Sequence, residues 1–169
     1  MRKTAAATGS ALFFAAAPGL VAGLVPWWLT GWQVRGPLAH WTLLRVAGLI
    51  MLILGAIVLV QAFARFVAEG HGTPAPVAPT ERLVVGGLYR YVRNPQYVGV
   101  VLVVVGEALL SGRVVLFGYA GLMAIGYQLF VVYYEEPTLG RLFGESYARY
   151  REAVPRWLPG RLGRTGRGG

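Results

Sequence analysis

Long apolar segments alternate with short polar connectors along most of this chain. Apolar residues dominate about 11–29, 44–63, 96–110 and 114–134. Three of these segments approach the ~20 residues that an α-helix needs to cross the hydrocarbon core of a bilayer, and the third is shorter. The pattern therefore predicts an all-α, polytopic membrane protein with about four transmembrane helices, forming a single membrane domain over residues 1–169.

The first apolar segment admits two interpretations. A basic start at residues 1–3, followed by small apolar residues, is typical of a signal peptide. The apolar stretch is nevertheless as long as a bilayer span, and it ends in Trp27 and Trp28 rather than in a polar cleavage region. We therefore expect a retained transmembrane helix.

Polar residues are concentrated between the second and third apolar segments and after the fourth. Residues 66–95 form a Pro-rich stretch that is too long for a simple connector, and we expect a cytosolic loop there. After Glu136, leucine and aromatic residues recur every three or four positions, which predicts a cytosolic amphipathic tail helix over 136–154. Residues 160–169, rich in Gly and Arg, are expected to be disordered.

Only residues 111–113 separate the third and fourth apolar segments, so these segments are predicted to form an antiparallel helical hairpin. Glu107 falls inside the third segment and would be costly facing lipid. It should therefore face other helices or a polar cavity, with either a structural or a chemical role. Close packing of the helices is expected at small residues, namely Gly99, Gly106, Gly118 and Gly121.

Composition supports a membrane protein and indicates its orientation. Of the residues 56% are hydrophobic and 14% charged, whereas soluble domains carry about 25% charged residues. The net charge of +9 does not indicate nucleic acid, because the basic residues flank apolar segments. With four spans, every basic residue except Arg35, Arg45 and Arg113 lies on the side of both termini. The positive-inside rule then predicts a multi-pass inner or plasma membrane protein with cytoplasmic N- and C-termini.

The chain lacks the common sequence patterns of metal and triad chemistry. It contains no cysteine and only two histidines, which are assigned to opposite sides of the membrane. No metal is therefore expected. What remains is a set of polar residues at the start of the third apolar segment and at the end of the fourth, which the hairpin brings to one membrane face.

These polar residues suit a ligand with both charge signs and an aromatic plane. Asn94 is a good helix N-cap and Pro95 a good first helical residue, so the third helix should begin there. Glu135 and Glu136 can receive a cationic amine, arginine can pair with a carboxylate, and tyrosine rings can hold a purine or a sulfonium. The same residues are also typical of interfacial anchors, and the residues alone leave both interpretations open.

Two stretches carry a family resemblance: GLYRYVRNPQYVG at 87–99 and EEPTLGRLFGESYARYREAVP at 135–155. In them the chain resembles the isoprenylcysteine carboxyl methyltransferase and phospholipid methyltransferase superfamily of integral membrane enzymes. The resemblance implies S-adenosylmethionine as the cofactor and methyl donor, bound at the cytosolic face. The positions that match its motifs are Arg93, Asn94, Pro95, Tyr97, Gly99, Glu135, Glu136, Phe143, Gly144, Tyr147, Tyr150 and Pro155.

From the resemblance and the polar cluster together we predict a site. The predicted catalytic residues are Arg93, Glu135 and Glu136. The predicted cofactor-binding residues are Tyr91, Arg93, Asn94, Pro95, Tyr97, Gly99, Glu135, Glu136, Tyr147 and Tyr150. Two positions depart from the family pattern: Asn94 replaces a histidine, which removes any proton-handling role there, and Ala153 stands where a basic residue is frequent.

The acceptor implied by the resemblance is a lipidic or membrane-embedded molecule, either an isoprenylcysteine-type carboxylate or a phospholipid-type amine. A carboxylate arrives ionised and needs no base, whereas an amine must first lose a proton, for which Glu135 or Glu136 would serve. The alternative hypothesis is a small non-enzymatic four-helix membrane protein, a transporter subunit or scaffold, whose basic tail only anchors to lipid.

Overall fold

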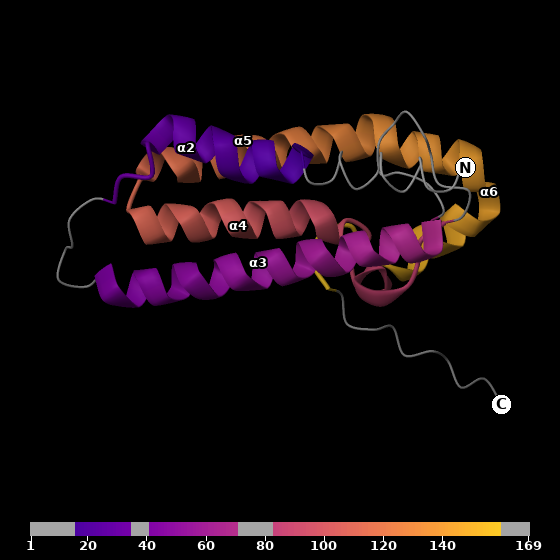
Figure 1. Ribbon diagram of the computed structural model, residues 1–169. Helices are drawn as coiled ribbons and strands as arrows, with labels where there is room; N and C mark the ends of the chain where they lie inside the picture. The colour runs from indigo at the N-terminus through magenta and orange to yellow at the C-terminus, as the bar shows by residue number, and fades with distance from the viewer. Residues whose placement is uncertain (1–15, 35–40, 71–82, 160–169) are drawn as a thin grey trace, which may run out of the picture.

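The computed structural model describes residues 16–34, 41–70 and 83–159 (Figure 1). Within them the chain is helical and contains no strand. The predicted disordered tail, the beginning of the first predicted span and the middle of the predicted loop lie outside these residues. The elements are η1 (Leu20–Leu24), α2 (Val25–Thr30), α3 (Trp41–Gly70), η2 (Gly87–Arg90), α4 (Pro95–Ser111), α5 (Val114–Phe130), η3 (Val131–Glu135) and α6 (Glu136–Ala153).

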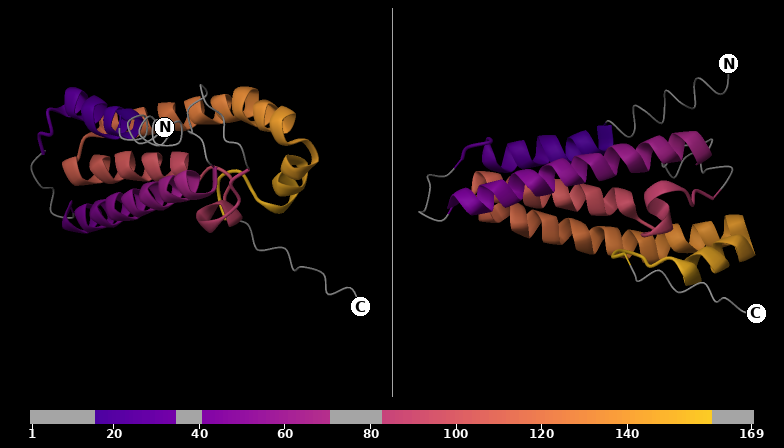
Figure 2. Two further views of the ribbon diagram at one scale, coloured as in Figure 1. Left: turned by 45° about the vertical axis from the view of Figure 1, so that its right-hand side comes forward. Right: turned by 90° about the horizontal axis from the view of Figure 1, so that it is seen from below.

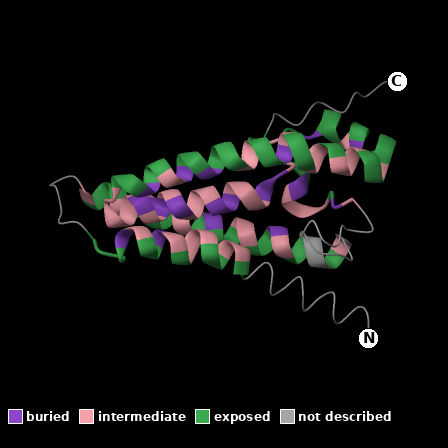
Figure 3. Ribbon diagram, turned by 90° about the horizontal axis from the view of Figure 1, so that it is seen from above, coloured by how far each residue is buried: buried purple, intermediate pink, exposed green. Residues whose placement is uncertain are grey.

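Helices α3, α4 and α5 run lengthwise beside one another, and α2 lies against α5 (Figures 1 and 2). Among the described residues, Trp41–Arg65 and Val114–Ala153 are helices long and apolar enough to cross a membrane, by length and composition. Ala16–Thr30 and Pro95–Ser111 are apolar but shorter. Buried positions gather where the helices face one another, and large apolar side chains are exposed on the outside (Figure 3). Apolar outer faces of this extent are typical of contact with lipid.

Helix α3 continues to Gly70, beyond the end of the apolar segment that hydropathy places at Phe63. The predicted loop over 66–95 therefore begins later than expected. Arg65 and Glu69, one helical turn apart, form an ion pair of 3.1 Å that supports the added turns. Hydropathy marks where a helix leaves an apolar environment, and a polar sequence can continue the helix past that point.

Glycines bring α3 and α4 into close contact. A Cβ atom on Gly106 would lie 2.7 Å from the backbone oxygen of Gly48, and one on Gly55 would lie 2.7 Å from that of Gly99. The predicted packing role of Gly99 and Gly106 is thus confirmed, with partners on α3. The same prediction is wrong for two glycines of α5, because no other described residue lies within 4 Å of a Cβ built there; these are Gly118 and Gly121.

The predicted hairpin is present as α4 and α5. Gly112 ends α4 with a φ of 68°, in the left-handed region that favours glycine, and its N–H donates to Ala108 O. The two helices share a core of Val100, Val104, Ala120 and Met123. Their antiparallel packing places the beginning of α4 beside the end of α5, as the short connector requires.

The fourth apolar segment and the tail helix are one continuous helical path, where the sequence predicts a separate tail helix from 136. Helix α5 passes through the π-helical η3 directly into α6. The wider π turn accommodates Pro137, which has no N–H to donate. The bend comes later, at Gly144, with φ 51° and ψ −123°. Past α6 the chain returns toward the beginning of α4 (Figure 2), where Arg93 N donates to Pro155 O at 2.9 Å.

Candidate functional site

The two sequence motifs meet where α4 begins and η3 ends. Tyr97, in the first turn of α4, donates its hydroxyl to Glu135 Oε2 at 3.0 Å. Pro95 starts the helix and the short α4–α5 connector sets the register, so a residue of the first turn lies opposite the last residue of η3. The structure therefore brings together two predicted site residues that are far apart in the sequence.

Glu136 lies at the centre of an ion cluster. Arg93 Nη1 lies 3.2 Å from Glu136 Oε1, and each of these two side chains is only 10% exposed. Arg156 binds the same carboxylate with two donors, Nε at 2.7 Å and Nη2 at 3.1 Å. This hydrogen bonding to Glu136 raises the pKa of Arg156. A bidentate arginine–carboxylate pair fixes both partners in one orientation, so the cluster ties the returning tail to α4 and α6.

Arg156 was not among the predicted site residues, although it directly follows the tail motif that ends at Pro155. One signal could have found it. It is a basic residue in the segment after an amphipathic helix, on the same membrane side as the predicted carboxylates. Its partner could not be read from the sequence, because the return of the chain depends on the bend at Gly144.

Asn94 occupies the predicted N-cap position of α4, but its side chain does not cap the helix within the described part of the chain. Its amide Nδ2 donates instead to Arg156 O at 3.2 Å, and Asn94 is buried, with 5% exposed. The expected capping bond, in which Asn94 Oδ1 would accept from a helix N–H, is therefore wrong for the described residues. The side chain is instead oriented by its Nδ2, which donates to a carbonyl of the returning tail. Asn94 holds the tail in place.

The predicted tyrosines of α6 also hold elements together. Arg93 Nη1 donates to Tyr147 Oη at 3.4 Å, and Tyr150 donates its hydroxyl to Tyr89 O at 2.7 Å. Tyr89 is buried with Ala62 and Val84, and burial raises the pKa of its hydroxyl well above the usual range. Tyr89 was missed by the sequence analysis. These contacts press the second half of α6 against η2 and the start of α4.

An apolar cavity of about 280 Å³ opens beside the Tyr97–Glu135 pair, between α4 and α5. Tyr97 and Tyr127 stack on one side of it with ring centroids 4.5 Å apart. Trp157 also lines it and is held there by a 2.6 Å hydrogen bond from its Nε1 to Gln128 Oε1. Tyr127, Gln128 and Trp157 were not among the predicted site residues. A polar Gln inside an apolar segment was the available signal, since such residues tend to be functional.

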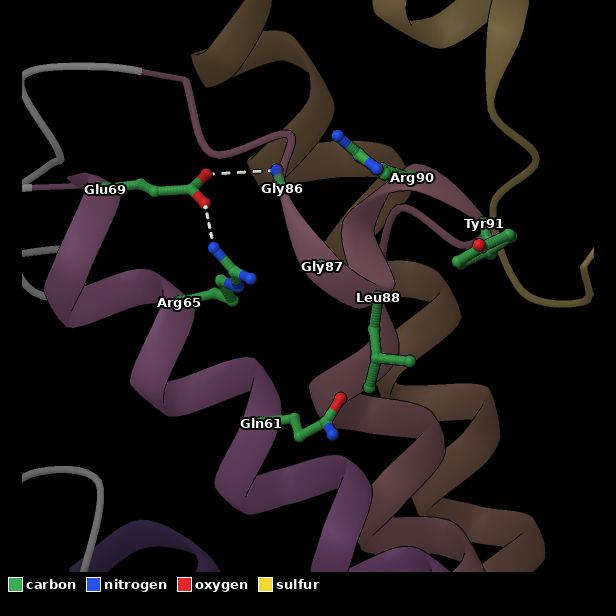
Figure 4. Close-up of a pocket in the computed structure, with 8 residues that line it drawn as sticks. All are labelled: Gln61, Arg65, Glu69, Gly86, Gly87, Leu88, Arg90 and Tyr91. Carbon is green, nitrogen blue, oxygen red and sulfur yellow. Dashed lines mark hydrogen bonds and ion pairs between the residues drawn. The ribbon is translucent and has the colours of Figure 1, made fainter.

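Of the ten predicted cofactor-binding residues, only Tyr97 is among the described residues that line this cavity. Pro95 is buried at the start of α4, and Gly99 packs against α3. Tyr91 lines a different pocket of about 370 Å³, between α3 and the η2 segment (Figure 4). In that pocket Glu69 accepts hydrogen bonds from Arg65 Nη1 at 3.1 Å and from the N–H of Gly86 at 3.0 Å.

The cluster keeps capacity for a ligand that carries both charge signs. Arg93 Nε is buried, and no hydrogen-bond acceptor in the described residues reaches it. Buried polar atoms without a partner are rare in folded proteins, so this donor points to an acidic group that joins the site. Glu135 supplies a carboxylate for a cationic group, and the stacked rings of Tyr97 and Tyr127 supply an aromatic face.

Comparison with known proteins identifies the family of the chain. Residues 43–146 match the family model described as phospholipid methyltransferase. The chain is similar to the protein-S-isoprenylcysteine O-methyltransferase of Schizosaccharomyces pombe, with 36% identity over 77 residues, covering 46% of this chain and 33% of the relative. It is also similar to that of Xenopus laevis, with 32% identity over 125 residues, covering 70% and 41%. The chain thus spans between a third and about two fifths of these relatives. No solved structure matches it significantly.

Proposed function

Because the chain belongs to the phospholipid methyltransferase family, we propose that it is an integral membrane enzyme that transfers a methyl group from S-adenosylmethionine to a lipidic acceptor at the cytosolic face. The observation that carries this proposal is the meeting of Tyr97 with Glu135 and of Arg93 with Glu136 beside an apolar cavity. Both halves of that arrangement fall within the residues that match the family.

The donor set fits the chemistry of this methyl donor. Arg93 Nε can donate to the carboxylate of the donor, and Glu135 can accept from its ammonium group. Tyr97 and Tyr127 present ring faces suited to a sulfonium or a purine. When bound, the donor supplies an electrophilic methyl group, so the protein has mainly to align the reactants and exclude water.

The two adjacent carboxylates have different roles in this proposal. Glu136 is already bound by two guanidinium groups and holds the tail over the site. Glu135 has a tyrosine hydroxyl as its hydrogen-bond partner within the described residues, which leaves it capacity for a ligand or a proton. If the acceptor is an amine, we assign the removal of its proton to Glu135. Asn94 carries an amide and takes no part in proton transfer.

The acceptor enters through the cavity between α4 and α5. Val98, Val101 and Leu102 line it with Trp157, so it suits an aliphatic chain rather than a polar group. An isoprenylcysteine-type carboxylate and a phospholipid-type amine both combine such a chain with a methylatable head. The names of the similar curated proteins support the first, and the description of the family supports the second.

Cofactor binding tests the site directly. Glu135→Gln is expected to weaken binding of S-adenosylhomocysteine about 10- to 150-fold, because one charge-assisted hydrogen bond is worth about 1.5–3 kcal/mol. Isothermal titration calorimetry on detergent-solubilised protein measures this. Glu145→Gln is the matched control, since Glu145 is exposed on α6 and should bind as the unchanged protein does. Failure of the unchanged protein to bind would contradict the proposal.

The stability of the methylated product in mild base distinguishes the two classes of acceptor. Incubation of the protein with radiolabelled S-adenosylmethionine and a membrane lipid extract should give a labelled lipid. A methyl ester loses its label as methanol in mild base, whereas an N-methyl group keeps it, so base treatment separates carboxylate from amine acceptors. If no lipid is labelled although the cofactor binds, the non-enzymatic alternative is favoured.

We also propose four membrane spans, with both termini and α6 in the cytosol. The natural chain has no cysteine, so single cysteines report topology without background. Glu145→Cys should react with a membrane-impermeant maleimide only in inverted vesicles. Val34→Cys, at an exposed position beside the cavity that Glu107 and Arg45 line at the opposite end of the bundle, should react only in intact cells. Labelling of both from the same side would contradict this topology.

A further inference from the structure

Another cavity, lined by both apolar and charged residues, lies at the other end of the bundle from the Arg93–Glu136 cluster. It has a volume of about 310 Å³ and is bounded by the ends of α2 and α4 and the beginnings of α3 and α5, which meet at one end of the molecule (Figure 1). Glu107 and Arg45 line it together with Thr30 and Trp32. The cavity therefore offers both charge signs and an aromatic ring. None of the residues proposed for methyl transfer is among the described residues that line it.

Glu107 is the chemical centre of this cavity. The sequence predicted that it faces other helices or a polar cavity, and it lines a cavity between helices that also contains Arg45, Thr30 and Ser111 among apolar residues. Its Oε2 is buried, and no donor in the described residues hydrogen-bonds to it. A buried carboxylate oxygen left unsatisfied in this way destabilises the fold. A cationic group bound in the cavity would remove that destabilisation.

Trp32 is held over the cavity in a strained conformation. Its φ is 52°, which is rare for a bulky residue, and its N–H donates to Thr30 Oγ1 at 3.1 Å. Arg113 fixes the same turn by donating from Nε to Gln33 O at 3.0 Å and from Nη2 to Gln33 Oε1 at 3.0 Å. Strain of this kind persists only where its surroundings enforce it, and it clusters at ligand sites.

We propose that this cavity binds the headgroup of a zwitterionic phospholipid. The ammonium group lies beside the Glu107 carboxylate and under the Trp32 ring, and the phosphate binds Arg45, whose guanidinium has five N–H donors. The volume suits a small headgroup. The acyl chains continue along the exposed apolar faces of the neighbouring helices, where Leu43 is 78% exposed. This site is separate from the acceptor cavity and would anchor the bundle in the opposite leaflet.

The test uses the full chain in maltoside micelles and three probes: dihexanoylphosphatidylcholine, dihexanoylphosphatidylglycerol and free phosphocholine. Calorimetry should show the choline lipid binding about tenfold more tightly than the glycerol lipid, a difference of about 1.4 kcal/mol. Glu107→Gln should abolish that preference. Equal affinity for the two lipids would overturn the proposal, and so would phosphocholine binding as tightly as the choline lipid, since that indicates a soluble ligand.

A second variant distinguishes loss of the lipid site from a folding defect. Trp32→Gly removes the ring but favours the left-handed backbone conformation, so the fold should be kept. It should lose most of the choline-lipid affinity. Binding of S-adenosylhomocysteine should stay unchanged in both Glu107→Gln and Trp32→Gly, which also separates this proposal from the methyltransferase proposal. The exposed Glu152→Gln serves as the charge control. Choline-lipid binding by both cavity variants at the level of the unchanged protein would overturn the proposal.

Discussion

Replacing Glu136 by glutamine is expected to lower the rate of methyl transfer about 100-fold and to destabilise the fold by about 3 kcal/mol. Glu136 binds Arg93 and Arg156, and Arg93 is only 10% exposed. The Glu136→Gln substitution leaves the guanidinium groups of Arg93 and Arg156 without their shared carboxylate. The tail segment that these contacts hold would then move away from α4, taking Trp157 from the cavity. Initial rates with radiolabelled donor and thermal melting in detergent measure the two effects.

Two controls separate charge, stability and catalysis. Glu152→Gln removes an exposed carboxylate from the same helix and should change neither rate nor melting temperature appreciably. Replacing Glu136, Arg93 and Arg156 together by methionine should recover much of the stability, because apolar groups can substitute for a buried ion cluster. The rate should stay low. A Glu136→Gln enzyme with full activity would show that the tail does not form part of the site.

The second large effect is expected for Gly106→Leu, which should prevent α3 and α4 from packing. A Cβ atom there would lie 2.7 Å from both Gly48 O and Leu52 N, so the clash is with backbone, which cannot rotate away. Overpacking costs about 1–3 kcal/mol even where side chains can adjust. We expect aggregation or a clear loss of melting temperature, measured by size-exclusion chromatography and thermal unfolding in the same detergent.

Gly118→Leu is the matched control for Gly106→Leu. It makes the same chemical change in a neighbouring helix, at a position where no other described residue lies within 4 Å of the new Cβ. The added leucine would face outward, and stability should change by less than about 0.5 kcal/mol. Equal stability of the two variants would mean that α3 and α4 do not pack through their glycines.

Some of the site could be predicted because covalent connection leaves little choice. Residues 111–113 are too few to join helices in any arrangement other than a hairpin, so Tyr97 and Glu135 had to approach each other. The glycines of α4 and α5 show what such reasoning could not predict. Gly99 and Gly106 pack against α3, whereas Gly118 faces open space among the described residues, and composition alone does not distinguish them.

Partner choice within the cluster could not be predicted. The sequence indicated that Asn94 stands at the N-cap, but its side chain makes no capping bond; its Nδ2 donates to Arg156 O, a carbonyl that only the return of the tail brings there. Tyr91 was grouped with the site by its position in the motif. It instead lines the pocket beside α3, because it directly follows the 3₁₀ turn η2, which packs against α3.

The sequence by itself determined the helical class, the hairpin and the two polar stretches that meet at one end of it. Hydropathy, helix signals and a short connector are local properties, and they specify which ends come together. The tertiary structure alone decided that the entry to α4, crowded with polar groups, is closed by Arg156 and Trp157. That closure depends on the backbone angles of Gly144 and on which buried donors and acceptors the returning tail brings together. Neither can be predicted from a local sequence pattern.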